Sequence, residues 1–303
     1  MQHKPSEYLQ NIDEDKVDLI TGERIVRLCD VAFFTEDYLV QFPAMRKYVN
    51  TLITPDDLTN QPRLVEALVQ QSFTFFTKID WLTDFKKGVL PLIHSPFILV
   101  THNSDHLAGV DEDLLQNPFL VKWYGQNMMP ASQKTRGIPI GLENPDVWGR
   151  TNVEHLLRCR GVTKTKLLYF QFSDYSNKAR PNIRQTLRTK GFVENAQKNW
   201  LEYISELAEH KFCVAPPGNG VDTHRMWECI YLGVIPIAVR SPPMQEWFHG
   251  LPIMWVESYD EVTLASLKRF LKFSPRIGRI PSIARLSTVH RELQGHRQHV
   301  ASM

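Results

Sequence analysis

The chain has 303 residues, of which 43% are hydrophobic and 22% are charged, as is ordinary for a globular protein. This length exceeds the usual size of one domain, so we expect two domains of about 150 residues each. The 35 basic and 33 acidic residues leave a net charge of only +2, which argues against a nucleic-acid-binding protein.

The ends and the cysteines of the chain indicate its compartment. The first residues are polar and no apolar run is long enough to span a bilayer, so we expect a soluble, cytoplasmic protein without a signal peptide or transmembrane segment. Its four scattered cysteines lack the spacing of metal ligands, and we expect reduced, buried thiols.

The first half of the chain shows few regular patterns at its start and clearer strands later. Residues 1–60 are charged and irregular, and residues 62–76 have helical spacing of their apolar side chains. The predicted strands that follow cover residues 96–101, 119–124, 137–141 and 166–172. Each of them stops at a cluster of amides, hydroxyls or carboxylates. Because parallel sheets bind ligands beyond the carboxyl ends of their strands, we expect these clusters to line one cleft.

The segment His102-Asn-Ser-Asp-His106 follows the first of these strands. It combines a carboxylate with two imidazoles, so a general base, a metal site and a simple capping turn all remain open at this point. Further along, Asp111-Glu-Asp113 has the Asp-x-Asp spacing of some metal-binding enzymes but directly precedes two leucines, and we interpret it as a helix cap.

The most informative stretch covers residues 211–239. It predicts a buried strand at 212–215, a loop rich in proline and glycine, a helix capped by Asp222 or Thr223, a helix stop at Gly233 and a second strand at 234–239. The start of that helix follows flexible glycines, so its free N–H groups and its dipole favour an anion such as phosphate.

The side chains of this helix strengthen that interpretation. His224 and Arg225 lie in the first turn, where acidic residues are normally favoured, and Glu228 shares their face of the helix. Arg180, near the start of an earlier predicted helix, offers a second guanidinium for phosphate oxygens. Two alternatives remain: a surface ion pair between Arg225 and Glu228, and a solvated basic face around Arg180.

This stretch resembles the donor-binding segment of exostosin-like glycosyltransferases. The resemblance rests on Pro217-Gly218, Arg225, Glu228 and Gly233-Val-Ile-Pro236, and it is strong only over about residues 205–240. It implies an α/β protein of the GT-B type, with two Rossmann-like domains facing a central cleft. It also implies an inverting transferase that moves a hexose or pentose from a nucleotide sugar, usually UDP-linked, to a glycan acceptor. Because Arg225, Arg180 and the helix end supply the positive charge, we expect no metal or other cofactor.

On this reading residues 1–160 form the acceptor domain and residues 161–303 the donor domain. The expected donor-binding residues are Arg180, Gly218, Asn219, Gly220, Thr223, His224, Arg225 and Glu228. The expected acceptor-binding residues are His102, Asn103, Glu143 and Asn144, with Asp105 or His106 as catalytic base. An epimerase that acts on the same nucleotide sugar and an inactive glycan-binding relative are the alternatives.

The end of the chain predicts two more helices. Residues 260–273 have amphipathic spacing, and residues 288–303 are expected either to form a helix that packs back on the first domain or to fray. The sequence leaves the oligomeric state, the sugar, the acceptor and the linkage open.

Overall fold

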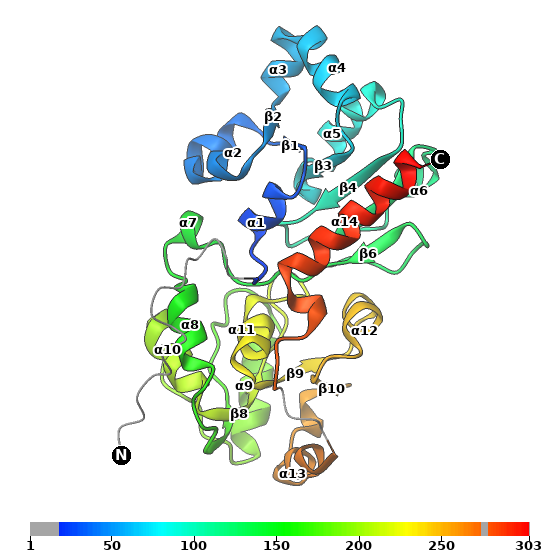
Figure 1. Cartoon of the computed structure of the whole chain (residues 1–303). Coiled ribbons are helices and arrows are strands. Elements are labelled where there is room, and N and C mark those ends of the chain that lie inside the picture. Colours follow the sequence, from blue (N-terminus) through cyan, green and yellow to red (C-terminus); the bar gives the residue numbers. More distant parts are fainter. Residues whose placement is uncertain (1–17, 274–277, 303) are drawn as a thin grey trace.

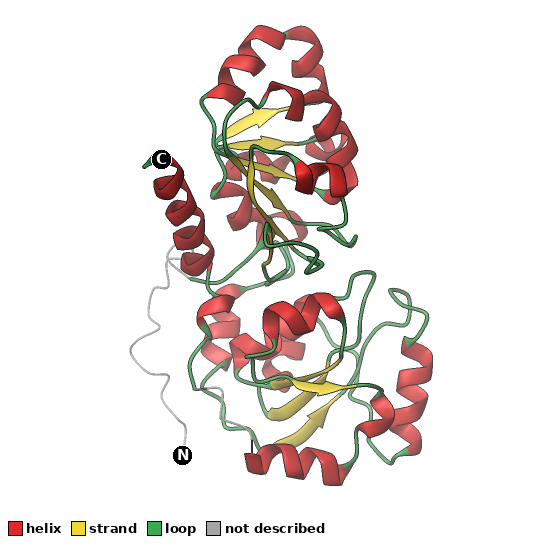
Figure 2. Ribbon diagram, turned by 90° about the vertical axis from the view of Figure 1, so that its right-hand side faces the viewer, coloured by secondary structure: helices red, strands yellow, loops and turns green. Residues whose placement is uncertain are grey.

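The computed structural model of the chain describes residues 18–273 and 278–302. It contains two parallel β-sheets, of six and four strands, in separate domains that lie one above the other in Figure 1. Figure 2 shows helices on both sides of each sheet, which is the layering of Rossmann-like folds. The expected α/β class with two Rossmann-like domains is confirmed.

The first sheet has the strand order β2-β1-β3-β4-β5-β6, and every pair is parallel. Its strands are β1 (Val31–Phe33), β2 (Thr51–Ile53), β3 (Thr74–Thr77), β4 (Phe97–Thr101), β5 (Leu120–Gly125) and β6 (Thr135–Gly137). The chain steps to one side of β1 to form β2 and then returns to its other side to form β3. Such a reversal opens a crevice at the carboxyl ends of the neighbouring strands.

Strand β4 shows why this sheet needs helices on both faces. All five of its residues are buried, with Phe97 and Leu99 in one apolar cluster and Ile98 and Val100 in another. The first cluster is completed by α4 (Pro62–Gln70), α5 (Leu82–Gly88) and α6 (Glu112–Gln116). The second is completed by α1 (Gly22–Arg27), α2 (Glu36–Gln41) and α14 (Leu286–Ala301).

The second sheet has the order β10-β9-β8-β7, also with parallel pairs only. Its strands are β7 (Lys166–Tyr169), β8 (His210–Val214), β9 (Ile235–Val239) and β10 (Met254–Val256). One face packs against α8 (Val153–Cys159), α10 (Trp200–Leu207), α11 (His224–Leu232) and α12 (Pro242–Phe248). The other packs against α9 (Arg180–Thr189) and α13 (Leu264–Phe273).

Short helices complete both domains. They are α3 (Pro55–Asn60), α7 (Pro145–Trp148) and the 3-10 helices η3 (Pro43–Tyr48), η4 (Ile79–Trp81), η5 (Leu90–Leu92), η6 (Tyr259–Glu261) and η7 (Ser282–Ala284). All four cysteines are free and buried, as expected. Within the described ranges, none of the helices combines the length and the hydropathy that a membrane span requires.

The last helix, α14, returns to the first domain (Figure 1). Val289 and Leu293 join the second apolar cluster of the first sheet. Glu292 accepts hydrogen bonds from Arg136 at 3.1 and 3.2 Å, and Arg297 donates to Asp30 at 2.7 Å. The two domains are therefore joined both by the connection near residue 150 and by the end of the chain.

Three predictions of local structure are wrong. Residues 1–60 are not irregular throughout, because the described part from residue 18 on contains β1, β2, three α-helices and the 3-10 helix η3; residues 1–17 lie outside the described part. Residues 62–76 are not one helix: α4 ends at Gln70 and buried β3 begins at Thr74.

The third error concerns the strand expected at residues 137–141, since β6 covers Thr135–Gly137 instead. Pro139 has no N–H to donate to a sheet, and Gly141 has a φ of +70° that a strand does not allow. The segment after β6 instead runs beside the start of α1, where a Cβ on Gly141 would lie 2.1 Å from the Ile20 carbonyl oxygen. The other predicted strands form with ends shifted by one to three residues.

Candidate functional site

A pocket of about 800 Å³ lies between the two domains. The first domain contributes residues that follow β4 and β6, and the second contributes the loops after β7 and β8 and the starts of α10 and α11. The predicted site residues that line it are Asp105, Glu143, Arg180, Gly218, Asn219, Gly220, Thr223, His224, Arg225 and Glu228. Residues predicted from both domains thus meet in one cavity, at the carboxyl ends of parallel strands.

The strand–loop–helix–strand unit predicted at residues 211–239 is confirmed as β8, α11 and β9. Gly233 ends the helix with a φ of +72°, the left-handed conformation expected after a last helical turn. Thr223 occupies the N-cap position, but its hydroxyl makes no capping bond and is buried without a partner in the described part of the chain. A hydroxyl that is left unsatisfied at the start of a helix in a pocket is suited to a ligand oxygen.

Arg180 and Arg225 lie on the second-domain wall of the pocket. Arg180 donates to the carbonyls of Pro217 and Ser173, both at 2.9 Å, so it holds the proline–glycine loop against the end of β7. Arg225 donates to the Gln171 carbonyl and lies over the Tyr203 ring, 5.2 Å from its centre.

The charge of Arg225 acts on Arg180. Burial and the nearby charge of Arg225 lower the pKa of Arg180 from its ordinary value. Over residues 18–273 and 278–302, neither Arg180 nor Arg225 forms an ion pair with a carboxylate. Glu228 and Asp174 are the nearest carboxylates and act on Arg225 and Arg180 only at longer range. Two close cations that no carboxylate contacts directly provide charge that a diphosphate could use.

Glu228 is only 6% exposed and does not pair with Arg225, so the alternative of a surface ion pair is wrong. Its carboxylate accepts from Trp200 Nε1 at 2.9 Å and from the Tyr203 hydroxyl at 2.8 Å, one bond to each oxygen. These two donors on α10 fix the carboxylate at the pocket wall. Because each carboxylate oxygen can accept a second bond, Glu228 can still bind a sugar hydroxyl.

Asp105 reaches the pocket from the first domain. Its side chain is exposed and accepts a hydrogen bond of 3.2 Å from Asn219 Nδ2, which belongs to the glycine loop of the second domain. This bond joins the predicted base to the predicted donor loop.

Gly220 explains how the loop comes so close to the first domain. A Cβ at this position would lie 2.8 Å from Asn127 Nδ2 and 3.2 Å from the Asp105 carbonyl oxygen. Asn127 donates to the Ser104 and Asp105 carbonyls and accepts from the Asp222 N–H at 2.9 Å. The glycine is therefore required by packing between the domains, whatever else the loop binds.

Neither predicted histidine of the 102–106 segment lines the pocket. His106 is exposed and faces Asp80, with 3.8 Å between Nε2 and Oδ1. His102 is buried with its Nε2 2.9 Å from the Pro139 carbonyl oxygen, and burial lowers its pKa to about 4. A neutral, enclosed imidazole supports the strand-end loop instead of meeting a substrate.

Two of the predicted acceptor residues, Asn103 and Asn144, are also engaged within the first domain. Their side chains bond to each other at 3.3 Å, and Asn144 accepts from the Glu23 N–H at 3.1 Å. Asn103 has a φ of +58°, which asparagine tolerates better than most residues. Glu143 does line the pocket and is bonded to Arg150.

His224 also lines the pocket, and its Nδ1 lies 2.9 Å from the Gly141 carbonyl oxygen of the first domain. It therefore contributes to the junction between the domains as well as to the first turn of α11.

Sequence reasoning missed the residues that hold the site together. The sequence indicates Asp222 only as a candidate helix cap, yet its carboxylate accepts from the Ile140 N–H at 2.7 Å and from Trp227 Nε1 at 2.6 Å. Burial raises its pKa to about 7. Asn127, Trp200 and Tyr203 gave no signal, because their partners lie 25 to 95 residues away in the sequence.

Two segments of the sequence, residues 102–106 and 111–113, contain residue types that can bind a metal. Asp111 is the N-cap of α6 and accepts from the Leu114 N–H at 2.9 Å, so the interpretation as a helix cap is confirmed. In the part of the chain that the structure describes, no three histidine, cysteine, aspartate or glutamate side chains gather as metal ligands would.

Comparison with known proteins does not assign the chain to a family. No family model matches it, and no curated protein matches it. The established facts are thus the two Rossmann-like domains and the composition of the pocket between them.

Proposed function

We propose that this protein is an inverting glycosyltransferase that moves a sugar from a nucleotide-sugar donor to an acceptor hydroxyl. The observation that carries the proposal is the composition of the pocket: Asp105 stands on one wall, and Arg180, Arg225, Glu228 and the start of α11 stand on the other. A carboxylate base opposite a cationic anion site is the arrangement that this reaction requires. Two Rossmann-like domains with a pocket between them are also compatible with the GT-B architecture.

The second domain would bind the donor. The diphosphate would lie at the start of α11, where free N–H groups, the Thr223 hydroxyl and the two guanidiniums of Arg180 and Arg225 converge on the pocket. Glu228 would accept hydroxyl groups of the ribose or of the transferred sugar. The preference for a UDP-linked donor rests on the resemblance of residues 205–240 alone.

The first domain would bind the acceptor and supply the base. The acceptor oxygen attacks the anomeric carbon from the face opposite the diphosphate, while the bond between that carbon and the phosphate oxygen breaks. The acceptor proton passes to the Asp105 carboxylate, and the negative charge on the leaving diphosphate is stabilised by the guanidiniums and helix N–H groups. One displacement of this kind inverts the configuration at the anomeric carbon.

The test is incubation with a panel of nucleotide sugars, with and without glycan acceptors, followed by measurement of released nucleotide. Release that depends on the acceptor, with an inverted anomeric configuration in the product, supports the proposal. Conversion of the donor without an acceptor would indicate an epimerase. Glycan binding without any turnover would indicate an inactive relative.

Activity should persist in EDTA, because the cations of this site are side chains and a helix end. Activity that EDTA abolishes and manganese restores would instead require a metal in the reaction.

A further inference from the structure

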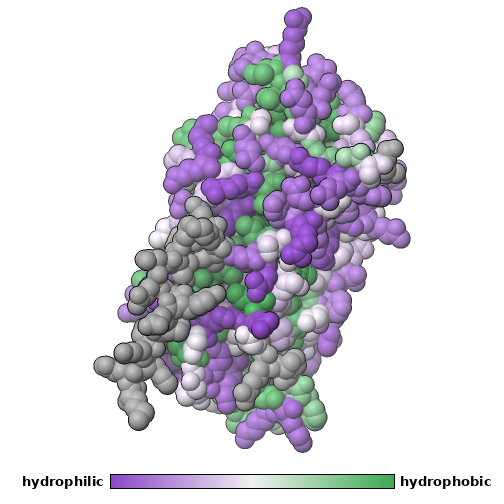
Figure 3. Space-filling model, in the orientation of Figure 1, coloured by the Kyte–Doolittle hydropathy of each residue, from purple (hydrophilic) through white to green (hydrophobic). Residues whose placement is uncertain are grey.

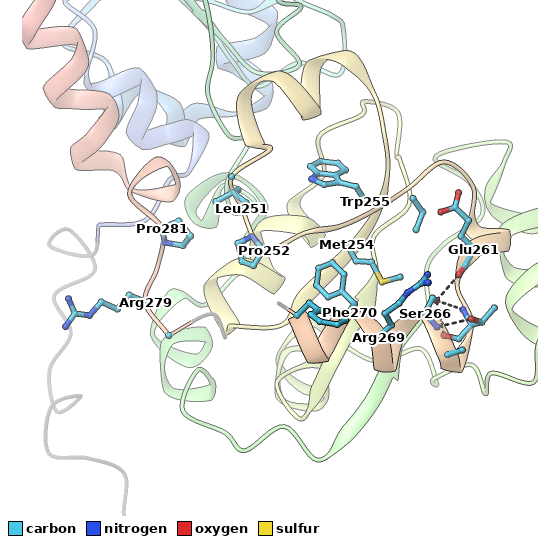
Figure 4. A pocket seen from close by; sticks show the side chains of 16 residues that line it. Leu251, Pro252, Met254, Trp255, Glu261, Ser266, Arg269, Phe270, Arg279 and Pro281 are labelled. Carbon is cyan, nitrogen blue, oxygen red and sulfur yellow. Dashed lines mark hydrogen bonds between the residues drawn. The ribbon is translucent and has the colours of Figure 1, made fainter. Parts of the chain in front are cut away.

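A second and larger cavity, of about 1180 Å³, lies in the second domain away from the predicted site. It is open to the surface and is lined by the edge strand β10, by α13 and by the return segment 278–281 (Figure 4). None of the predicted donor or acceptor residues lines it. The inference drawn from it is therefore independent of the proposed function.

The interior of this cavity is mainly apolar. Leu251, Pro252, Met254, Trp255 and Phe270 line it, and Figure 4 shows the rings of Trp255 and Phe270 on opposite sides of the space. The indole N–H of Trp255 is buried and finds no acceptor among the described residues. An apolar cavity of this size with one unpaired N–H donor is suited to a largely hydrocarbon ligand that also carries an oxygen as hydrogen-bond acceptor.

The helix on its rim is both basic and apolar on its exposed side. Lys268, Arg269 and Lys272 are exposed, and none of them bonds to a carboxylate in the ranges 18–273 and 278–302. At the two ends of the helix, on either side of these cations in the sequence, Leu264 is 55% exposed and Phe273 is 76% exposed. At the lower end of the molecule, the surface in Figure 3 is mixed, with hydrophobic residues lying among hydrophilic ones.

The remaining charged groups at the cavity do not neutralise these cations. Glu261 lines the cavity and accepts from the Glu257 N–H at 2.9 Å and the Ser258 N–H at 3.3 Å, so it adds one negative charge against the several cations of α13. Arg279, on the return segment, points away from the cavity in Figure 4. The rim is therefore positively charged next to an apolar interior.

We propose that α13 and this cavity bind the surface of a membrane that contains anionic lipids. Lys268, Arg269 and Lys272 contact the head groups, while Phe273 enters the interface and an acyl chain enters the cavity beside Trp255. Exposed cations interleaved with single large apolar side chains are the features of helices that lie in a membrane interface. The helix also lies at the end of the molecule farthest from the first domain (Figure 1), where a flat surface can reach it.

The proposal is tested by flotation of the full chain with vesicles of phosphatidylcholine alone or mixed with phosphatidylserine. We expect binding to the mixed vesicles only, and weaker binding at high salt. The variant Arg269→Glu/Lys272→Glu/Phe273→Ser should lose binding by at least about tenfold, since each basic residue contributes about fivefold. Failure of the natural chain to float with the mixed vesicles at low salt overturns the proposal.

A matched control is offered by the first domain, where Arg63, Leu64 and Lys87 are also exposed. The variant Arg63→Glu/Lys87→Glu/Leu64→Ser changes net charge and apolar content in the same way. It should float as the natural chain does, and equal loss in both variants would mean that the attraction is not local to α13. Binding to polyglutamate without binding to vesicles would indicate an acidic protein partner and would also overturn the proposal.

Entry of an acyl chain into the cavity has its own measurement. Vesicles with brominated acyl chains should quench the tryptophan emission of the natural chain, and the quenched fraction should fall in Trp255→Phe. An unchanged fraction would show that no chain enters beside Trp255.

Discussion

Arg180 and Arg225 differ in how many hydrogen bonds their guanidiniums make within the protein. Arg180 uses its guanidinium to hold three carbonyls of loops that border the pocket, whereas Arg225 donates to one carbonyl and lies over the Tyr203 ring. Stacking on a ring leaves the edge N–H groups of a guanidinium available for other acceptors. Arg225 is therefore the residue expected to contribute most to phosphate binding, and Arg180 is expected to shape the loop as well.

This leads to a prediction for Arg225→Ala. Nucleotide affinity should fall by about 2 to 4 kcal/mol, the usual effect of losing charged hydrogen bonds, while the fold persists. Isothermal titration calorimetry measures the affinity, and circular dichroism checks the fold. Arg188→Ala is the control, because Arg188 bonds to Glu194 outside the pocket and its loss should leave the affinity unchanged. A folded Arg225→Ala variant with normal affinity would remove Arg225 from the site.

Asp105 and His106 are neighbours in sequence, but the structure separates their surroundings. Asp105 lies in the pocket against Asn219, while His106 faces Asp80 outside it. Asp105→Asn should keep the bond to Asn219 yet slow transfer by about a hundred- to ten-thousand-fold, because an amide cannot accept the proton. The rate is measured as released nucleotide at saturating donor, with donor affinity expected to change little.

His106→Ala is the companion variant and should retain most of the rate. A near-normal rate in Asp105→Asn would exclude it as the base. The reverse pattern, with loss in His106→Ala only, would mean that the loop rearranges when the substrate binds.

At the scale of elements, the glycine loop has two glycines in different surroundings. A methyl group on Gly220 would meet Asn127 Nδ2 at 2.8 Å, whereas one on Gly218 would meet nothing closer than Arg180 Nη2 at 3.5 Å. Asn127 cannot move aside without losing its bonds to Ser104 and Asp222. The loop is thus constrained at one glycine by contact between the domains.

Gly220→Ala should consequently reduce the free energy of unfolding by about 1 to 3 kcal/mol, the usual effect of overpacking. Gly218→Ala is the matched control and should change it by much less. Urea unfolding followed by circular dichroism compares the two. An equal loss of unfolding free energy in both variants would mean that the two glycines are needed for the backbone conformation of the loop, and not for close contact between the domains.

The elements that the sequence predicted well are those whose signals are local. The unit from β8 to β9 combines an apolar run, a loop of prolines and glycines and a terminal glycine within 30 residues or so, and all of these act on their own neighbourhood. Strands β1 and β2 have three residues each, too few to show a period. β1 is buried inside the sheet, whereas β2 is an edge strand of which only Ile53 is buried, so both depend on pairing with strands distant in sequence. For the same reason Glu228 could be placed on its helix but not against Trp200.

At the scale of the whole molecule, contacts between distant segments unite the two domains. The Tyr231 hydroxyl accepts from the Ile20 N–H at 3.2 Å and donates to the Ala284 carbonyl at 2.9 Å, so α11 contacts both the start and the end of the described chain. Asn127, Asp222 and Trp247 make similar links. Nothing in the sequence near these residues encodes their partners, since each contact depends on how the finished domains meet.

Helix α14 gives the most direct test of this unity. Leu293 is 2% exposed and lies in an apolar cluster on one face of the first sheet. Val26 belongs to the same cluster, although it lies 267 residues earlier in the sequence. If α14 is an integral layer of the first domain, Leu293→Ala should reduce the free energy of unfolding by about 2 to 5 kcal/mol, as for other buried leucines. Gly295 is the control on the same helix, because it is exposed and a Cβ there meets nothing within 4 Å. Gly295→Ala should instead stabilise the protein by about 0.5 to 1 kcal/mol. Denaturant unfolding of both variants decides the matter: a Leu293→Ala variant as stable as the natural chain would mean that the first sheet does not depend on the end of the chain for its cover.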